Sequence, residues 1–394
     1  MKLELTSEHI DPNALDIINR LQDAKFTTYL VGGCVRDLLI GLRPKDFDIV
    51  TMARPEQVQK IVRPSFIIGK RFRLVLVRRG GQQFEVATFR SLSYANEDNP
   101  EAVDENVYGE PKEDAIRRDF TINGLFYDPR TKEIIDHTEG LRDIEQRVVR
   151  MIGEPKLRIE QDPIRILRAL RFAHKINFSL ETSLRVAIEQ NAHLLKGAVL
   201  PRLREELLKI MRLDDPAKAL WEAHDLQILK NIAPTIDELV ADNTRSDIFF
   251  SLLNQGLHTV TGSTDATLLY SIFMYSYLAA HNDHWTESLH TRFDDKLLTF
   301  MRMELGMHRI ETEVFGQAIN LLKQLVKNPT PEKMRARHRD HLLTNRAFDL
   351  ALHLAEAYHH LSHYETHLWQ GLANQLAAKE SGQKDHRRDP KVGL

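Results

Sequence analysis

The sequence contains one cysteine among 394 residues and carries almost no excess charge, with a formal net charge of -2 at pH 7. The single cysteine, Cys34, excludes an internal disulfide framework and is typical of a reducing compartment. No run of about 18 apolar residues is present, so the sequence predicts no transmembrane helix. Its first residues lack the apolar segment of a secretory signal peptide. We therefore expect a cytoplasmic protein that does not act in a membrane.

The near-neutral charge neither favours nor excludes a nucleic acid as partner. Phosphate binding usually needs a surplus of basic residues, which in this chain must be local. The best candidate is the segment 150–171, which contains Arg150, Lys156, Arg158, Arg165, Arg168 and Arg171. The segment 97–113 is instead acidic and rich in Asn, Gly and Pro, a composition that predicts a mobile loop.

The pattern of apolar residues divides the chain into a mixed part and a helical part. Before residue 150 it predicts helices at 11–24, 35–40 and 55–62 and strands at 27–31, 46–50, 65–68, 72–79 and 83–89. Gly80-Gly81 predicts a hairpin turn between the last two strands. From about residue 152 the patterns are helical, at 163–175, 181–195, 201–211, 265–280, 311–327 and 345–378. The predicted fold class is therefore α+β, with an α/β first part and an all-helical second part.

Two carboxylates stand two residues apart in the predicted strand 46–50. Residues two apart in a strand point to the same face and lie roughly 7 Å apart, so Asp46 and Asp48 would project together while Phe47 and Ile49 face the core. Such a pair can hold two Mg²⁺ ions, one to activate a 3′-hydroxyl and one to stabilise a pyrophosphate leaving group. A solvated strand end is the other explanation for the motif.

A pair of glycines upstream predicts a phosphate-binding turn. Gly32 and Gly33 lie between a predicted strand and a predicted helix, where backbone N–H groups can approach a phosphate closely. Arg36, one turn into the helix, can add a charge-assisted bond to a triphosphate oxygen, and Asp37 follows it. A plain strand-to-helix turn explains the glycines, but it does not explain the Arg36-Asp37 pair so near the two aspartates.

Five ordered blocks within residues 25 to 215 resemble class II CCA-adding enzymes and bacterial poly(A) polymerases. The blocks are 31–41, 44–50, 84–90, 116–125 and 162–172. The resemblance implies a nucleotidyltransferase head of DNA polymerase β-like fold, followed by an all-helical neck and body. It also implies two Mg²⁺ ions held by Asp46 and Asp48, ATP as a substrate and RNA 3′ ends as the partner.

On this resemblance we expect four parts along the chain. A catalytic head would span residues 1–150, and a helical neck with base-reading and RNA-binding elements would span 151–215. A helical RNA-binding body would follow at 216–380, and a polar tail at 381–394.

The resemblance further implies roles for residues in the 84–90 and 116–125 blocks. Glu85 would supply a third catalytic carboxylate, although an ordinary strand-end charge explains it nearly as well. Asp119 would orient an arginine, bind the ribose or act as a further catalytic carboxylate, and the sequence leaves these roles open. The other expected nucleotide contacts in these blocks are Arg90, Arg117, Arg118 and Asn123. A surface helix with paired arginines is the alternative explanation for the second block.

The last block contains a candidate for reading the base of the nucleotide. Asp162 and Arg165 stand three apart in a predicted helix and would share a face, with Arg168 continuing the row. A carboxylate can accept from the exocyclic amine of adenine or cytosine, and an arginine can donate to the adjacent ring nitrogen. We therefore expect use of ATP, or of ATP and CTP, and rejection of UTP and GTP. Gln161 stands where many relatives have Glu, so we expect altered tuning with retained selectivity.

The block 67–77 favours poly(A) synthesis, because bacterial poly(A) polymerases have a basic pair followed by Phe-Arg-Leu there, as in this chain. Lys70, Arg71 and Arg73, together with Arg171, would bind RNA phosphates, whereas a solvated strand edge is the alternative for the first three. We predict a polymerase that adds AMP from ATP to RNA 3′ ends. The alternative is a CCA-adding enzyme that uses CTP and ATP, which the short basic tail and neutral charge favour. A catalytically inactive RNA-binding protein is a third possibility, against which the intact Asp46 and Asp48 argue.

Overall fold

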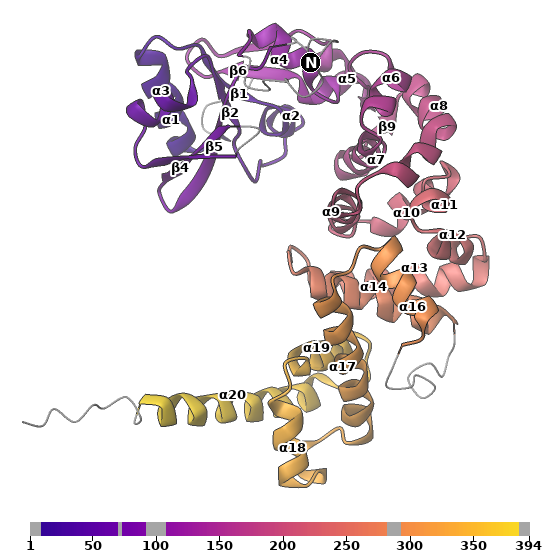
Figure 1. Cartoon of the computed structure of the whole chain (residues 1–394). Helices are drawn as coiled ribbons and strands as arrows, with labels where there is room; N and C mark the ends of the chain where they lie inside the picture. Colours follow the sequence, from indigo (N-terminus) through magenta and orange to yellow (C-terminus); the bar gives the residue numbers. More distant parts are fainter. Residues whose placement is uncertain (1–8, 70–72, 92–107, 282–292, 386–394) are drawn as a thin grey trace, which may run out of the picture. The chain divides into compact units, whose positions relative to one another are not determined.

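The computed structural model describes residues 9–69, 73–91, 108–281 and 293–385, with side chains up to residue 378 (Figure 1). The chain divides into two compact units, Met1–Asn191 and Ala192–Leu394. Lys70, Arg71 and most of the loop predicted at 97–113 lie outside the described residues. The described end of that loop differs from our prediction, because residues from Pro111 onward form a helix.

The first unit is built on a mixed sheet with the strand order β3-β4-β5-β2-β1-β6-β7. Its strands are β1 Thr28–Val31, β2 Ile49–Thr51, β3 Ser65–Ile68, β4 Leu74–Arg79, β5 Gln82–Thr88, β6 Leu125–Asp128 and β7 Glu133–Asp136. Strands β2 and β5 pair in parallel, and the other neighbouring pairs in this sheet are antiparallel. Gly80 and Gly81 join β4 to β5 with φ angles of 55° and 77°. These left-handed values confirm the predicted hairpin turn.

Helices and a short second sheet complete the first unit. The helices are α1 Pro12–Asp23, α2 Gly33–Leu39, α3 Pro55–Ile61, α4 Pro111–Arg117, α5 Gly140–Gln146, α6 Pro155–Gln161, α7 Ile164–Ile176 and α8 Thr182–Asn191. A 3₁₀ turn, Thr121–Asn123, precedes β6, and β8 Val148–Val149 pairs in parallel with β9 Ser179–Leu180. The first unit therefore includes α6, α7 and α8, which we assigned to a neck. Our division into head, neck and body stays a prediction.

The core of the first unit lies where the central strands meet α4. Val31, Val50, Phe89, Ala115 and Phe126 form a buried cluster there. The rings of Phe89 and Phe126 meet edge to face with centroids 5.9 Å apart, a favourable arrangement for aromatic pairs. This cluster packs β1, β2 and β6 against α4.

The strand predicted at 46–50 is shorter than expected. It begins at Ile49, so Asp46 and Asp48 lie in the segment that leads into β2. The Asp48 carbonyl still accepts a hydrogen bond from the Val31 amide at 3.1 Å, which holds this segment beside β1. Ile49 is buried as predicted, whereas Phe47 is half-buried.

The second unit is helical throughout its described part. Its elements are the 3₁₀ helix Ala192–Gly197, α9 Leu200–Ile210, α10 Pro216–Asp225, α11 Leu229–Ile232, α12 Pro234–Val240, α13 Asn243–His258, α14 Ala266–His281, α16 Asp295–Thr299, a π turn Phe300–Glu304, α17 Arg309–Lys327, the 3₁₀ turn Pro331–Lys333, α18 Ala336–Leu343, α19 Phe348–Ala357 and α20 His363–Asp385. The helix predicted at 345–378 is wrong in one respect, because the chain breaks between α19 and α20 with His359 at φ 59°. None of the described helices combines the length and apolarity needed to cross a bilayer.

Candidate active site

The turn between β1 and α2 requires glycine for two reasons. Gly32 has a φ of 75°, a backbone conformation that L side chains rarely adopt. A Cβ on Gly32 would also lie 3.2 Å from Nη1 of Arg118. The Gly32 amide donates to the Leu125 carbonyl at 3.0 Å, which ties the turn to β6. The turn therefore brings the predicted glycine motif and the predicted nucleotide contact Arg118 side by side.

A group of acidic side chains lies at the start of β2. Ile49 of β2 pairs in parallel with Val86 of β5. Asp48, the residue before β2, therefore lies beside Glu85, the residue before Val86 in β5. Asp46, Asp48 and Glu85 are all accessible to solvent. The pKa of Asp48 is raised by partial burial of its carboxylate and by the negative charges of Glu85 and Asp46, while the positive charge of Arg118 opposes the shift. Negative charge therefore outweighs positive charge around Asp48.

The donor chemistry of this acidic group suits Mg²⁺. Carboxylate oxygens are hard ligands, and the excess negative charge around Asp48 would be relieved by a divalent cation. Within the described residues, no three His, Cys, Asp or Glu side chains converge as a complete metal site. Mg²⁺ is usually bound by one or two carboxylates, with substrate phosphates and water as the other ligands. Asp46 and Asp48 therefore supply the number of carboxylate ligands that a protein usually gives to Mg²⁺.

Arg36 lies in the interior, whereas the sequence predicted a contact with a triphosphate. Its side chain is 1% exposed, and its guanidinium is already bonded on both sides. Nε donates to Asp37 Oδ1 at 2.8 Å, and Nη1 donates to Asn123 Oδ1 at 2.5 Å. Asp37 also faces the Lys175 ammonium at 3.4 Å. Arg36 thus joins α2 to the 3₁₀ turn and, through Asp37, to α7.

The same chain of polar contacts continues to Asp119. Asp119 accepts from Arg168 Nε at 2.9 Å and from Asn123 Nδ2 at 3.2 Å. Burial alone would raise the pKa of Asp119, but the positive charge and hydrogen bonds of Arg168, with those of Asn123 and Phe120, hold it below its usual value. Of the three roles left open by the sequence, orienting an arginine is the one that this geometry favours.

Asp162 does not share a helical face with Arg165 as we expected. Asp162 has an extended backbone between α6 and α7, and α7 begins at Ile164. Its carboxylate accepts from the Ile164 amide at 3.3 Å, while Arg165 donates to the Arg158 carbonyl at 2.5 Å. The signal was available in the sequence, because the residue before a proline is disfavoured in a helix and Pro163 follows Asp162. The base-reading role of the pair stays a prediction.

Arg158 is a site residue to which we assigned no specific role. It is 9% exposed, and its Nη2 donates to the carbonyls of Arg117 and Arg118 at 2.8 and 2.7 Å. Its Nη1 reaches Gln161 Oε1 at 3.4 Å. Arg158 therefore fixes the end of α4, and Gln161 holds Arg158 weakly from the other side. Its partners are main-chain carbonyls about 40 residues away in the sequence, so the sequence gave no sign of this role.

We expect the substitution Gln161→Glu to stabilise the first unit by about 1 kcal/mol, because an ion pair with Arg158 would replace a long bond to a neutral amide. The preference among ATP, CTP, GTP and UTP should not change, since Gln161 acts on Arg158 and not on the base. Thermal melts and incorporation assays with each nucleotide would measure both effects. Gln161→Met, which offers no acceptor, is the control. An unchanged melting temperature in the Glu variant, or a changed nucleotide preference, would contradict this account.

The remaining predicted nucleotide contacts, Arg118, Arg117 and Arg90, differ in burial and in bonding partners. Arg118 is held by Asp114, with Nη2 to Oδ2 at 2.9 Å, and its guanidinium lies over the Phe126 ring. Arg117 is half-buried. The amide of Arg90 donates to Asp114 Oδ1 at 3.3 Å, so this carboxylate joins the end of β5 to α4.

Of the residues predicted to bind RNA, the two that the structure describes, Arg73 and Arg171, make contacts within the first unit. Arg73 is paired with Glu56 at the start of α3. Arg171 is 9% exposed, and its guanidinium lies 4.1 Å from the centre of the Phe172 ring. Buried against this ring, Arg171 is better placed to pack α7 than to reach RNA.

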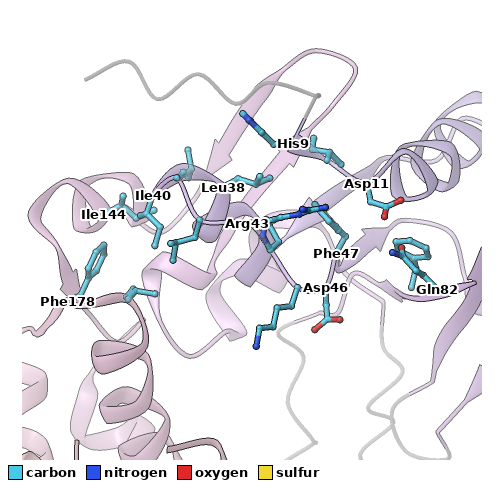
Figure 2. A pocket seen from close by; sticks show the side chains of 18 of the residues that line it. His9, Asp11, Leu38, Ile40, Arg43, Asp46, Phe47, Gln82, Ile144 and Phe178 are labelled. Atoms are coloured by element: carbon cyan, nitrogen blue, oxygen red, sulfur yellow. The ribbon is translucent and has the colours of Figure 1, made fainter. Parts of the chain in front are cut away.

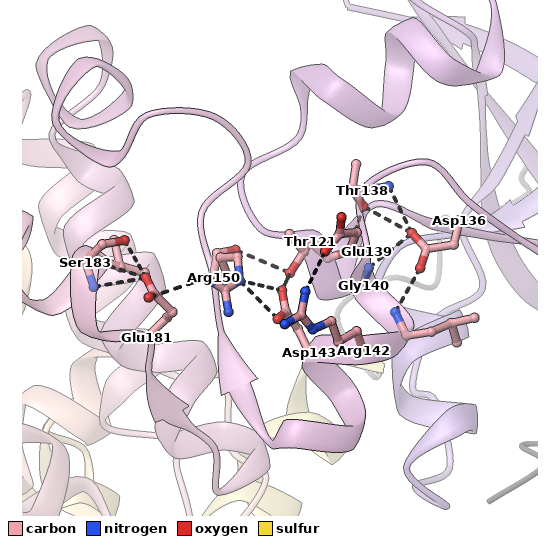
Figure 3. A network of polar contacts seen from close by, with 12 residues as sticks. Thr121, Asp136, Thr138, Glu139, Gly140, Arg142, Asp143, Arg150, Glu181 and Ser183 are labelled. Carbon is pink, nitrogen blue, oxygen red and sulfur yellow. Dashed lines mark hydrogen bonds and ion pairs between the residues drawn. The ribbon is translucent and has the colours of Figure 1, made fainter.

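The basic segment 150–171 is largely used inside the first unit. Arg150 donates from Nε to Asp143 at 3.0 Å and reaches Glu181 at 3.4 Å, as Figure 3 shows. Asp143 also accepts from the Thr121 hydroxyl at 2.6 Å. Arg150 thus ties α5 and the 3₁₀ turn to the segment that begins α8. Because Arg158, Arg165 and Arg168 also bond within the unit, this segment offers less free positive charge than its sequence suggested.

A cleft of about 1620 Å³ borders Asp46 in the first unit. Its walls come from the start of α1, the end of α2, the segment 40–47, the start of β5 and the region around Phe178. Figure 2 shows Arg43, Asp46 and Phe47 together in the segment that leads to β2. Asp46 is the one predicted catalytic or nucleotide-binding residue in the described lining of this cleft. The cleft therefore adjoins the acidic group, while the glycine turn and Arg118 lie apart from its lining.

Comparison with known proteins identifies two regions of the chain. Residues 28–150 match the poly A polymerase head domain, and residues 177–240 match a family described as a probable RNA and SrmB-binding site of polymerase A. The chain is 38% identical over 248 residues to poly(A) polymerase I of Salmonella typhi, covering 61% of this chain and 53% of that protein. It is 38% identical over 198 residues to the CCA-adding enzyme of Lactobacillus helveticus, covering 50% and 49%. The chain thus spans about half the length of the curated relatives it matches.

Solved structures extend the likeness in fold over most of the chain. The Bacillus stearothermophilus CCA-adding enzyme in complex with CTP has a TM-score of 0.66 at 23% identity and covers 94% of this chain and 83% of that one. The Thermotoga maritima CCA-adding enzyme complexed with tRNA has a TM-score of 0.56 at 22% identity, with coverage of 92% and 82%. At these identities the likeness shows the fold. The predicted class, a mixed nucleotidyltransferase head with helical parts after it, is confirmed.

Proposed function

Because the chain belongs to the nucleotidyltransferase family of poly(A) polymerases and CCA-adding enzymes, we propose that it adds AMP from ATP to RNA 3′ ends. The observation that carries the proposal is the acidic group of Asp46, Asp48 and Glu85, next to a glycine turn and Arg118. The reaction would take place in the cytoplasm, the reducing compartment that a single cysteine suggests.

In this proposal Asp46 and Asp48 hold two Mg²⁺ ions. When bound, these ions supply stabilisation of the charge that develops on the reacting phosphate and on the two oxygens that attack and leave. The RNA 3′-oxygen forms a bond to the α-phosphorus as the bond to pyrophosphate breaks. The hydroxyl proton passes to water or to Glu85, the carboxylate beside Asp48. Arg118, which lies beside the Gly32 turn, would bind a phosphate oxygen.

The contacts of α7 support a second role, in orienting the nucleotide. Asp119 holds the Arg168 guanidinium from one side, which limits the directions that its remaining N–H groups can take. Arg165 stands three residues earlier on the same helix, so both arginines extend from neighbouring turns. We propose that these arginines, with Asp162 at the start of α7, read the shared edge of adenine and cytosine.

The alternative to poly(A) synthesis is a CCA-adding enzyme that uses CTP and ATP, because the chain resembles relatives of both activities. The match to poly(A) polymerase I runs over 248 residues, and the match to the Lactobacillus helveticus enzyme runs over 198. The longer match favours poly(A) synthesis. The fold of a solved CCA-adding enzyme extends over 94% of this chain, but at 23% identity this likeness shows the fold and does not separate the two activities. The block 67–77 that favoured poly(A) synthesis includes residues 70–72, which lie outside the described residues.

We expect long ladders when the protein is given Mg²⁺, ATP and an unstructured RNA, and little product with UTP or GTP. A tRNA that lacks its CCA end, offered ATP alone, CTP alone or both, is the matched primer. Gel analysis of both primers would separate the two activities, because addition that stops after C-C-A on tRNA identifies a CCA-adding enzyme. RNA binding without incorporation on either primer would instead support an inactive RNA-binding protein.

A further inference from the structure

Two segments on either side of the α5 core contact the 3₁₀ turn Thr121–Asn123 in the first unit. Residues 136–143 run from the end of β7 into the first turn of α5, and residues 147–152 lead away from α5 through β8. We call these two segments together the cradle of the turn, and Figure 3 shows several of its side chains around Thr121. Because the turn follows directly after Asp119 and Phe120, the cradle adjoins the polar network that holds Asp119.

Asp143 of the cradle holds the side chain of Thr121. Its carboxylate is buried, and Oδ2 accepts from the Thr121 hydroxyl at 2.6 Å. Its two oxygens also accept from Arg150 Nε at 3.0 and 3.1 Å. Burying a carboxylate without such partners is costly, and a buried polar group whose bonds are satisfied favours one arrangement of its neighbours. Asp143 therefore sets where the Thr121 hydroxyl lies.

The backbone of Thr121 is held by the cradle as well. Its amide donates to the Arg150 carbonyl at 3.0 Å, and its carbonyl accepts from the Thr138 hydroxyl at 3.3 Å. A Cβ on Gly140 would lie 2.3 Å from the Thr121 carbonyl oxygen, so only glycine permits the cradle to approach the turn this closely. Thr121 is thus fixed through its hydroxyl, its amide and its carbonyl.

The first segment of the cradle has its own support. Asp136 Oδ1 accepts from the amides of Thr138 and Gly140 at 2.9 and 3.1 Å, and Oδ2 accepts from the Leu141 amide at 3.0 Å, as Figure 3 shows. One carboxylate thus binds three amides of the loop that follows it. These bonds close the loop on itself, so Gly140 and Asp143 meet the turn from a loop whose conformation does not depend on the turn alone.

The residues on both sides of Thr121 connect the turn to α7. Asp119, two residues earlier, accepts from Arg168 Nε at 2.9 Å. Asn123, two residues later, donates to Asp119 at 3.2 Å. The Asp119 carbonyl also accepts from the Ile152 amide of the cradle at 3.0 Å. Because Asp119 and Asn123 flank Thr121 so closely, a displacement of Thr121 would move the carboxylate that holds Arg168.

We propose that Asp143 and Thr121 are positioning residues for the choice of nucleotide. Asp143 fixes Thr121, the turn fixes Asp119, and Asp119 fixes the direction of the Arg168 guanidinium. The inference rests on the proposed function in taking Arg168 as a residue that reads the base. Asp143 and Thr121 are 1% and 3% exposed, so they act on the nucleotide through Asp119 and Arg168 and not by contact.

The test is the ratio of kcat/KM for ATP to kcat/KM for GTP, measured by extension of a short RNA primer. Thr121→Val keeps the shape of the side chain and removes the hydroxyl that Asp143 binds. A displacement of about 1 Å in a positioned group can cost 10²-fold in rate, so we expect this ratio to fall at least about 10-fold. A partly unfolded protein loses activity with both nucleotides alike, so a loss of stability alone would not change the ratio.

Three further variants make the result specific. Thr121→Ser keeps a hydroxyl and should keep the parent's ratio. The matched control, Thr28→Val, removes another buried hydroxyl bond, to the Phe26 carbonyl at 3.0 Å, and should lower the melting temperature without changing the ratio. Asp143→Asn should lower the ratio, and adding it to Thr121→Val should lower the ratio no further, because both changes break the same contact. A Thr121→Val variant that melts earlier but keeps the parent's ratio would overturn the proposal.

Calorimetric titration with ATP or GTP, in the presence of Mg²⁺ and without primer, distinguishes this inference from the proposed function. If the parent protein prefers ATP but extends no primer, the proposed transfer of AMP fails, and the inference stands when Thr121→Val removes the preference. If the parent protein extends primers with ATP and GTP equally well, nucleotide transfer stands. The inference is then overturned, because there is no selection for Asp143 and Thr121 to support.

Discussion

Replacing Asp48 with asparagine should reduce nucleotide incorporation at least about 10³-fold, because the amide can no longer share in binding the two cations that stabilise the reacting phosphate. The same loss is expected for Asp46→Asn. Initial rates of AMP incorporation into an RNA primer, with excess Mg²⁺ and ATP, measure the effect. A double Asp46→Ala/Asp48→Ala variant that still incorporated nucleotide would contradict the assignment of the metal site.

The Asp48→Asn variant should also melt at a higher temperature than the parent at neutral pH. Folding raises the pKa of Asp48, first through burial and then through Glu85 and Asp46, so the ionised carboxylate destabilises the fold. That penalty is fully present above the raised pKa of the folded state and is lost as the pH falls from this pKa to the lower pKa of the unfolded chain. Thermal melts without metal at pH 7.5 and in the acidic range should show the difference shrinking. Asp23→Asn, an exposed carboxylate paired with Arg130, is the control and should change neither rate nor melting temperature appreciably.

A gain in stability together with a loss of activity would separate a functional carboxylate from a structural one. Replacing a residue that stabilises the fold lowers the free energy of unfolding. Replacing a residue that is held against like charges raises it. Melting temperatures of Asp48→Asn that fall below the parent's at pH 7.5 would therefore argue that Asp48 stabilises the head, and the proposed role would lose its main electrostatic support.

Local sequence patterns predicted most elements of the head but not where β2 begins. The alternation of apolar and polar residues over 46–50 continues through Asp46, so the pattern alone predicts a strand there. A strand needs a hydrogen-bonded partner, and the pairing of β2 with β1 and β5 begins at Ile49. The chain therefore joins the sheet just after the two aspartates. The pairing of distant strands decides this, and no window of five residues contains that information.

The sequence predicted which residues gather at the candidate site better than it predicted the contacts that each of them makes. The glycine turn, the two aspartates and Arg118 are near one another, as their motifs suggested. Arg36 was expected to face a triphosphate and instead is buried, because its partner Asn123 is 87 residues away and Lys175 is 138 residues from Asp37. Whether an arginine is buried depends on such partners, and single-sequence reasoning could not pair them.

Replacing Arg36 with methionine should destabilise the first unit by about 3–5 kcal/mol, because it leaves Asp37 and Asn123 buried without their shared donor. Urea denaturation measures the loss. Arg20→Met, which breaks the exposed pair with Asp16, is the control and should cost less than about 1 kcal/mol. Arg36→Lys should recover part of the loss, since an ammonium keeps the charge but cannot bond to both partners at once.

A second substitution tests whether the loss comes from an unpaired charge. In Arg36→Met, the buried Asp37 carboxylate keeps Lys175 as its charged neighbour. Adding Asp37→Asn removes this carboxylate. The double variant should therefore be more stable than Arg36→Met alone, with non-additive free energies of unfolding. Additive losses would mean that Arg36 acts by filling space against Phe172. Non-additive losses would show that the buried charges joining α2, the 3₁₀ turn and α7 act together, so the glycine turn and Arg168 are held by one connected network.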